Sequence, residues 1–243
     1  RSLEFGASQR VDAVDADFQY SFNPTERQHV IWGVGYRRNS SDTTDGTVIS
    51  VLPRQRDDNI YSAFVQDEIT LVPERWKLTL GTKIEKYPNT GNELQPNARL
   101  LWTPDDKHSL WAAVSRAVRT PSWAEQGVQY SAMTIPPGTP TNPSPVPVLV
   151  TAMGDPNLRA EKMVAYELGW RGLLRPSVSA DAALFYFDYR DAISNSPGVA
   201  QPMGPFTPWP SYILQPVYFT NYAKARTYGG ELAMSWQVSE AWK

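Results

Sequence analysis

The sequence has no cysteine, only two histidines and no long apolar run. The absence of cysteine excludes disulfide bonds and thiolate metal sites, and it is compatible with exposure to an oxidising periplasm. A transmembrane helix needs roughly 18 consecutive apolar residues. Because no segment has them, a helical membrane protein is excluded. The net charge of −2 lacks the basic surplus of a nucleic-acid-binding protein, so we expect no nucleic acid as a partner.

Residues suited to catalysis or to metal binding are scarce and scattered. His29 and His108 each begin an expected strand beside a short turn, away from any nucleophile or metal cluster. The acidic pairs at 57–58 and 105–106 lie in connectors, where solvated turn residues are common. The segment 40–46 lacks the full pattern of a calcium-binding loop, and no Gly-rich phosphate loop is present. We therefore expect no enzymatic activity, no metal site and no cofactor.

What the sequence does have is alternation of apolar and polar residues. In the segment 76–87, Trp76, Leu78, Leu80 and Ile84 share one face, and the residues between them are mostly polar. This is the pattern of a strand with one apolar face. A mean hydropathy of −0.43 does not exclude a membrane barrel, because lumen-facing polar residues alternate with lipid-facing ones. Alternation predicts strands at 12–22, 29–39, 59–72, 76–87, 96–103, 108–117, 161–172, 178–190 and 226–238.

One expected strand breaks its own pattern. In the segment 59–72, Asp67 falls on the apolar face. We expect a bulge or a local hydrogen-bond partner there, because an isolated carboxylate on such a face is costly.

The connectors alternate between short and long. The short ones are 23–28, 73–75, 104–107 and 173–177, and the longer ones are 40–58, 88–95, 119–160 and 191–220. Antiparallel strands with short turns at one rim and long loops at the other are typical of an outer-membrane barrel. We therefore predict an all-β fold with short periplasmic turns and long extracellular loops.

The aromatic residues of the apolar faces are sorted by position. Tryptophans near the short turns predict one girdle, and tyrosines near the long loops predict a second, as expected where amphipathic rings sit at both membrane interfaces. A soluble barrel or sandwich has no need for this sorting. The predicted girdles comprise Trp32, Trp76, Trp102, Trp170 and Trp236 at the short turns, and Tyr36, Tyr61, Tyr186 and Tyr228 towards the long loops.

Four cations fall on the apolar faces near the long loops: Arg38, Lys86, Arg116 and Arg226. We predict membrane lipid as the partner of this surface, and we hypothesise that the cations meet anionic groups of lipopolysaccharide. The alternative is that they snorkel to water.

The long loops hold the candidate substrate-binding residues. Trp123, Tyr130, Trp209 and Tyr212 are expected in loops, where they either stack on a ligand or pack the loops together. Arg119 either pairs with an anionic ligand or with a loop carboxylate, and we favour the carboxylate. The loop 119–160 has six prolines between positions 136 and 147, which predict that it is stiff and disfavours helix.

Several short motifs carry a family resemblance. Ser115 to Ser122 (SRAVRTPS), Phe64 to Glu68 (FVQDE) and Tyr166 to Gly169 (YELG) resemble segments of TonB-dependent outer-membrane receptors, as do Phe185-Tyr186 and Tyr189-Arg190-Asp191. The resemblance covers nearly the whole chain. It implies a barrel of about 22 strands with an N-terminal plug. Such a barrel imports a scarce small-molecule nutrient, of the ferric siderophore, cobalamin or carbohydrate class, with energy from TonB.

The sequence departs from that family pattern by omission. It has no recognisable plug, no TonB box and fewer than half of the strands, so the TonB complex would act through a plug domain missing from this chain. We interpret residues 1–243 as one partial barrel domain of about nine to ten strands, in the outer membrane of a Gram-negative bacterium. Alone, it is expected not to insert stably, because unpaired strand edges are costly in lipid. A passive porin-like barrel is the alternative function, and a soluble β-barrel binding protein is a third possibility.

Overall fold

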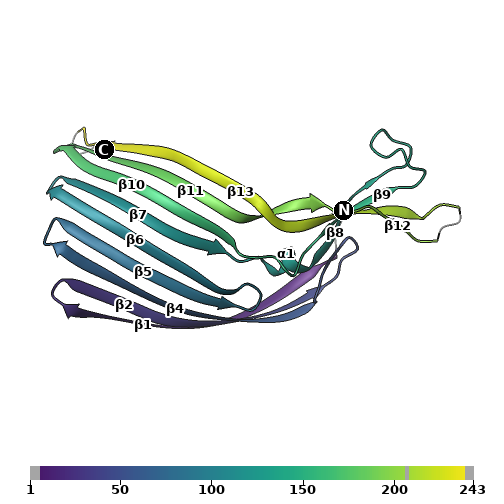
Figure 1. Ribbon diagram of the computed structural model, residues 1–243, viewed down its shortest axis with the longest axis horizontal. Helices are drawn as coiled ribbons and strands as arrows, with labels where there is room; N and C mark the ends of the chain where they lie inside the picture. Colours follow the sequence, from purple (N-terminus) through teal and green to yellow (C-terminus); the bar gives the residue numbers. More distant parts are fainter. Residues whose placement is uncertain (1–5, 206–207, 239–243) are drawn as a thin grey trace.

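The computed structural model describes residues 6–205 and 208–238, which form one curved sheet (Figure 1). Its wall consists of long strands that pair antiparallel with their neighbours in chain order. The antiparallel all-β architecture predicted from the sequence is confirmed. The wall strands are β1 Ser8–Thr25, β2 Gln28–Thr44, β4 Gln55–Val72, β5 Trp76–Tyr87, β6 Gly91–Asp105, β7 His108–Arg119, β10 Glu161–Arg175, β11 Val178–Pro197 and β13 Tyr212–Trp236.

Each segment predicted as a strand coincides with one of these wall strands, and the segment 76–87 is β5 itself. The strands extend further than predicted on the long-loop side. There, β2 runs on to Thr44, β11 runs on to Pro197, and β13 begins at Tyr212. The prediction of a longer connector at 88–95 is wrong. Only residues 88–90 join β5 to β6, because β6 begins at Gly91.

The two faces of the wall differ in chemistry. The apolar face leaves large side chains such as Val65, Leu168 and Leu184 exposed. The opposite face carries ion pairs between neighbouring strands, including Lys77 with Glu68 at 2.8 Å. An antiparallel sheet with one apolar and one polar face is built to separate two different environments. Among the described residues, no helix is both long and apolar enough to cross a membrane.

Asp67 has the local partner that the sequence led us to expect. The side-chain amide of Gln28 on β2 donates to Oδ2 of Asp67 on β4 at 2.9 Å. The register shift in the β4–β5 pairing lies elsewhere, between Thr70 and Val72. A hydrogen bond across two strands therefore satisfies one carboxylate oxygen without a bulge at its position, whereas Oδ1 is buried and has no partner among the described residues.

Three of the long connectors contribute strands to a second region, which we call the loop sheet. It consists of β3 Ile49–Val51, β8 Val128–Ile135 and β9 Val148–Met153, together with the first part of β13. β8 is antiparallel to both β3 and β9, whereas β9 is parallel to β13 over residues 213–218. The short strand β12 Gln201–Met203 pairs with β13. Figure 1 shows this region extending beyond the wall.

The prediction that the segment 119–160 disfavours helix is wrong at its start. A one-turn helix, α1 Trp123–Gly127, begins there with a capping box. In it, the Ser122 hydroxyl accepts from the N–H of Glu125 at 3.2 Å, and the Glu125 carboxylate accepts from the N–H of Ser122 at 2.7 Å. The clustered prolines lie further along, between β8 and β9, where they do not affect α1.

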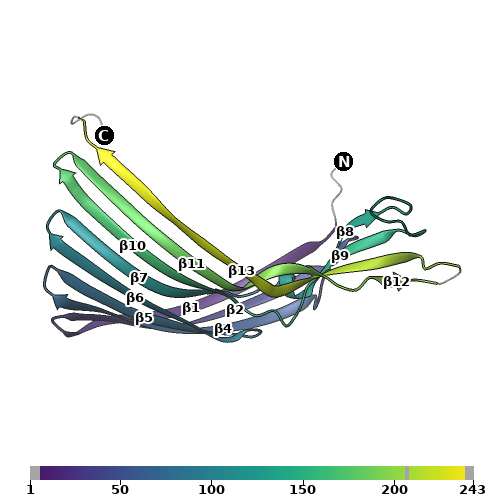
Figure 2. The ribbon, with the colours of Figure 1, turned by 45° about the horizontal axis from the view of Figure 1, so that its top comes forward.

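The wall does not close on itself within the described residues. β1 pairs only with β2, and the part of β13 from residue 227 to 236 pairs only with β11. The result is an open, strongly curved sheet, with β1 and β13 at its two edges (Figure 2).

Candidate functional site

A hollow of mixed polarity and about 310 Å³, here called the mouth pocket, lies where the polar face of the wall meets the start of α1. β1, β2 and β4 provide one side, and the β5–β6 turn and the β7–α1 connection provide the other. The lining is a mixture of amides, hydroxyls, one Arg–Asp pair and aromatic rings. It consists of Gln9, Val11, Asn39, Ser41, Arg56, Asp58, Ile60, Tyr87, Pro88, Asn89, Thr90, Thr120, Pro121, Ser122 and Trp123.

Arg56 is the one cation among the described residues that line the mouth pocket. Its side chain is 16% exposed, and its Nε donates to Oδ1 of Asp58 at 2.7 Å. Its Nη1 donates to the side-chain oxygen of Gln126, also at 2.7 Å. Gln126 is itself only 6% exposed, and the amide of Asn89 lies against both groups. A charge held this firmly is a fixed hydrogen-bond donor at the pocket wall.

Two buried polar groups of the mouth pocket have no hydrogen-bond partner among the described residues. They are the indole N–H of Trp123 and the hydroxyl of Thr90. A buried donor without an acceptor costs about 1–3 kcal/mol. Both groups are therefore suited to meet an oxygen-rich molecule in the pocket.

Arg119 holds α1 against the wall. Its Nε donates to Glu161 of β10 at 2.5 Å, and its two Nη groups donate to both oxygens of Glu125 at 3.0 and 3.1 Å. Glu161 also accepts from the backbone N–H of Ile193 at 2.6 Å. The guanidinium is thus occupied by two carboxylates, which is the pairing favoured from the sequence, rather than presented to an anion.

The same contacts shift the acidity of Glu125. Burial alone would raise its pKa, but hydrogen bonds from the Arg119 guanidinium and from Ser122 outweigh burial and lower the pKa below its usual value. The carboxylate form is therefore the one that the folded helix favours.

Two glycines allow α1 to sit where it does. At Gly127, a Cβ atom would lie 1.9 Å from the carbonyl oxygen of Leu52, and at Gly154 it would lie 2.6 Å from the backbone of Gln126. The Leu52 N–H donates to the Gly127 carbonyl at 2.9 Å. Close backbone contact thus fixes Gln126 and Trp123 relative to β3 and β9.

The other predicted substrate-binding aromatics lie elsewhere. Tyr130 is on β8 opposite Ile49, and Tyr212 is the first residue of β13 opposite Met203. Trp209 precedes β13 and is exposed. None of the three lines the mouth pocket, so of the predicted aromatic set only Trp123 does. Tyr130 and Tyr212 are also strand residues rather than loop residues, which corrects the expectation from sequence.

Sequence reasoning missed most of the mouth pocket. Arg56 and Asn89 were assigned to connectors, and Gln126 had no pattern around it. The one available signal was the Ser122–Glu125 spacing of a capping box, which would have placed α1 and its Gln126.

The predicted girdle residues lie on the apolar face. At the short-turn end, Trp76 and Trp102 stack with ring centres 5.3 Å apart. Towards the loops, Tyr36 and Tyr61 lie 5.3 Å apart. The remaining members, Trp32, Trp170, Trp236, Tyr186 and Tyr228, alternate with polar residues on their own strands in the same way.

Tyr166 belongs to the tyrosine girdle but was not predicted from the sequence. Tyr166 of β10 lies opposite Tyr186, which lies opposite Tyr228, so three tyrosines form one row across β10, β11 and β13.

No cluster of three or more potential metal-binding side chains is present in residues 6–205 and 208–238.

The family model of the TonB-dependent receptor-like β-barrel matches residues 2–243, which is nearly the whole chain. The chain belongs to this family. TonB-dependent receptor barrels lie in the outer membrane of Gram-negative bacteria, and that is the location of this chain. The antiparallel barrel-fragment fold predicted from the sequence is thereby confirmed.

Individual relatives agree with the family. The chain is 25% identical over 182 residues to the iron-regulated outer membrane virulence protein of Vibrio cholerae, covering 74% of the chain and 25% of that protein. It resembles the ferric enterobactin receptor PfeA of Pseudomonas aeruginosa with a TM-score of 0.74 and 18% identity, covering 96% of the chain and 34% of the receptor.

The siderophore receptor PirA of Acinetobacter baumannii has the same fold, with a TM-score of 0.69 and 16% identity, over 96% of the chain and 35% of the receptor. At these identities the structural likeness shows the fold. The chain spans about a quarter of the curated relatives and about a third of the solved receptors.

Proposed function

We propose that this chain forms part of the wall and the outer mouth of an active transporter. The transporter imports a scarce small-molecule nutrient across the outer membrane with energy from TonB. Family membership supports this proposal, and the observation that carries it is the mouth pocket. There, loop residues such as Trp123 and Gln126 meet the polar face of the wall. A binding site at the outer rim of the polar face is what a gated importer requires, whereas passive diffusion needs no such site.

The ferric siderophore class is our preferred substrate. Arg56, Thr90 and the indole N–H of Trp123 provide hydrogen-bonding groups beside aromatic surface, which suits a ligand rich in oxygen acceptors. The iron-regulated relative and the siderophore receptors with the same fold support this class. Cobalamin and carbohydrates are the alternatives. We assign no enzymatic role and no resident cofactor to the chain.

We further propose that additional strands complete the barrel, which would then have about 22 strands in total. The free edges of β1 and β13 would leave backbone groups without partners in lipid, where each costs several kcal/mol. The greater length of the relatives leaves room for these strands and for a plug that contacts TonB.

The test is growth of a strain deleted for the complete gene on defined iron, cobalamin and glycan sources, with and without TonB. We expect loss of growth on one or more ferric siderophores, restored by the intact gene only when TonB is present. Uptake that persists without TonB would instead support the passive porin-like barrel.

A further inference from the structure

A basic cluster lies on the apolar face of the wall, on the long-loop side of the row formed by Tyr166, Tyr186 and Tyr228. Asp188 accepts from Arg190 at 2.9 Å and lies 3.7 Å from Arg226, while Asp191 lies 3.0 Å from Arg159 and 3.1 Å from Lys162. We call these residues the rim cluster. It consists of Arg159, Lys162, Arg190 and Arg226 with Asp188 and Asp191.

Each carboxylate of the rim cluster is shared by two cations, so the cluster has two positive charges in excess. The side chains of Arg190 and Arg226 are 69% and 72% exposed, whereas that of Asp188 is only 19% exposed. The cationic groups are therefore outermost. Such a surface attracts anions, and guanidinium groups bind phosphate as well as carboxylate in a bidentate geometry.

The other outward arginines of the predicted set do not share this excess. Arg38 pairs one-to-one with Asp57 at 3.2 Å. Arg116 donates to the carbonyl of Leu94 at 2.8 Å and lies 3.8 Å from Glu93. Lys86 of the same set makes no ion pair within residues 6–205 and 208–238, so it contributes one isolated charge on β5. The larger surplus, of two charges, lies at β10, β11 and β13.

The rim cluster borders the row formed by Tyr166, Tyr186 and Tyr228. Asp188 and Arg190 follow Tyr186 on alternate positions of β11, and Asp188 lies opposite Arg226. Tyrosine rings concentrate at membrane–water interfaces, where the ring is in contact with apolar chains and the hydroxyl with polar groups. The cluster therefore stands at the height of lipid headgroups.

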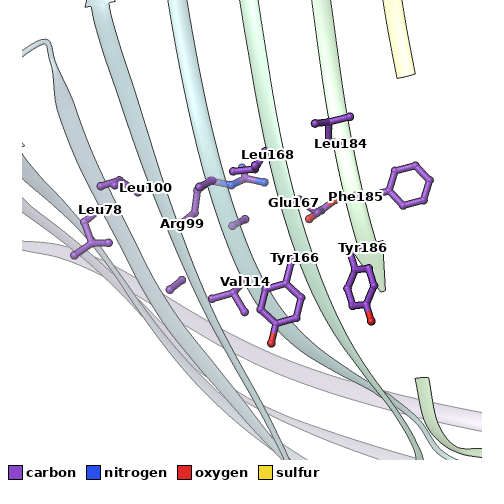
Figure 3. Close-up of a pocket in the computed structure, with 13 residues that line it drawn as sticks. Leu78, Arg99, Leu100, Val114, Tyr166, Glu167, Leu168, Leu184, Phe185 and Tyr186 are labelled. Atoms are coloured by element: carbon purple, nitrogen blue, oxygen red, sulfur yellow. The ribbon is translucent and has the colours of Figure 1, made fainter. Parts of the chain in front are cut away.

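An apolar groove begins at Tyr166 and Tyr186 and runs towards the tryptophan end of the wall. Two hollows of about 570 and 390 Å³ share Leu100, Ala112, Leu168 and Leu184, so they are continuous. Small residues open the groove, above all Ala112, which lines both hollows. Figure 3 shows Tyr166 and Tyr186 at one end, with Val114, Leu168 and Leu184 around it.

We propose that this surface is a docking site for one phosphorylated glycolipid of the outer leaflet, with its phosphate on the rim cluster and an acyl chain in the groove. The inference rests on the proposed membrane-spanning function. The ligand is a lipid rather than a free anion, because the apolar groove starts next to the cationic rim cluster and extends along the apolar face. A soluble anion has no use for the groove, and a neutral lipid has no use for the surplus charge.

The test measures lipopolysaccharide bound to the complete purified receptor after exchange into detergent. We compare wild type with an Arg190→Gln/Arg226→Gln double variant and with Ala112→Phe, which fills the groove but keeps the surface apolar. Arg38→Gln is the matched control, because that arginine is already neutralised by Asp57. Heat-modifiable migration verifies that each variant is folded.

We expect the double variant and Ala112→Phe each to retain less than a third of the wild-type lipid, and Arg38→Gln to retain all of it. Wild-type protein should also prefer lipopolysaccharide over the same lipid with its phosphates removed. Equal retention by the double variant, or displacement of the lipid by millimolar inorganic phosphate alone, would overturn the proposal. Unchanged lipid retention by Ala112→Phe would overturn the part of the proposal that places an acyl chain in the groove. Lipid retention is read without any nutrient, so a failed uptake assay leaves this result independent.

Discussion

In the mouth pocket, Nη1 of Arg56 donates a 2.7 Å hydrogen bond to the side chain of Gln126, although the two residues are 70 positions apart in the chain. The bond joins β4 of the wall to α1 of a distant connector. Together with the Arg119 ion pairs and the Gly127 backbone contact, this bond helps to hold the loop residues over the polar face, and its contribution can be tested.

Replacing Gln126 with leucine should weaken nutrient binding by about tenfold, equivalent to about 1.4 kcal/mol. The leucine has a similar volume but cannot accept from Arg56, which then keeps only Asp58 as a firm partner. Titration of the complete receptor with its nutrient measures the change in Kd. Gln129→Leu, at an exposed position of β8, is the control and should bind as wild type does. Wild-type affinity in Gln126→Leu would contradict the assigned role of this contact.

Replacing Trp123 with phenylalanine tests the unpartnered indole N–H. The ring surface is largely kept, but the donor is lost, so binding should weaken by roughly fivefold, or about 1 kcal/mol. The stability of the receptor without nutrient should not fall, because the N–H has no protein partner to lose. The same substitution at Trp209, which does not line the mouth pocket, serves as the control. If both variants bind equally well, the indole N–H does not contact the ligand.

A Gly127→Ala variant should displace α1 from β3. The new methyl group would meet the Leu52 carbonyl oxygen at 1.9 Å, a backbone atom that cannot rotate away. We expect increased protease cleavage within residues 120–135 and a clear loss of nutrient uptake. Gly230→Ala is the matched control, because its nearest neighbour is a flexible leucine methyl group at 2.8 Å. Equal protease resistance of the two variants would show that the contact is not tight.

Acid should release α1 through Glu125. Because its pKa is lowered in the folded protein, Glu125 stabilises the folded state above its ordinary value of 4.5, and this stabilisation is lost as the pH falls below that value. The protection of residues 122–127 against hydrogen exchange, measured relative to the intrinsic rates, should therefore fall between neutral pH and about pH 3. In Glu125→Gln, exchange should be faster at neutral pH and should lose most of this pH dependence. A variant with the full wild-type pH response would assign the effect to another group.

The wall was predictable because its signal is local. From Trp76 to Tyr87, every second residue reports which face it lies on, and β5 has those same bounds. The need for a partner at Asp67 followed from the same alternation, and Gln28 supplies it. Family motifs then provided the wider architecture, which no single strand contains.

The loop sheet was not predictable, because its causes are distant in sequence. β9 becomes a strand by pairing in parallel with β13, more than 60 positions away, and β3 has only three residues. Pro216, which is fully buried, lies in the segment where β13 pairs with β9, although proline disfavours a paired strand. The mouth pocket shares this limitation, since its members come from five separate stretches that only the folded chain brings together.

The shared loop sheet has a consequence for how such transporters diversify. β3, β8 and β13 come from three different connectors, yet each satisfies backbone groups of another. Exchanging the connector 119–160 for that of a relative would leave an unmatched strand edge in each of the other two, and exchanging either of those would leave one in the connector 119–160. The three connectors should therefore be inherited as a set, so a change of cargo would arise by replacing them together or by altering side chains within an unchanged backbone.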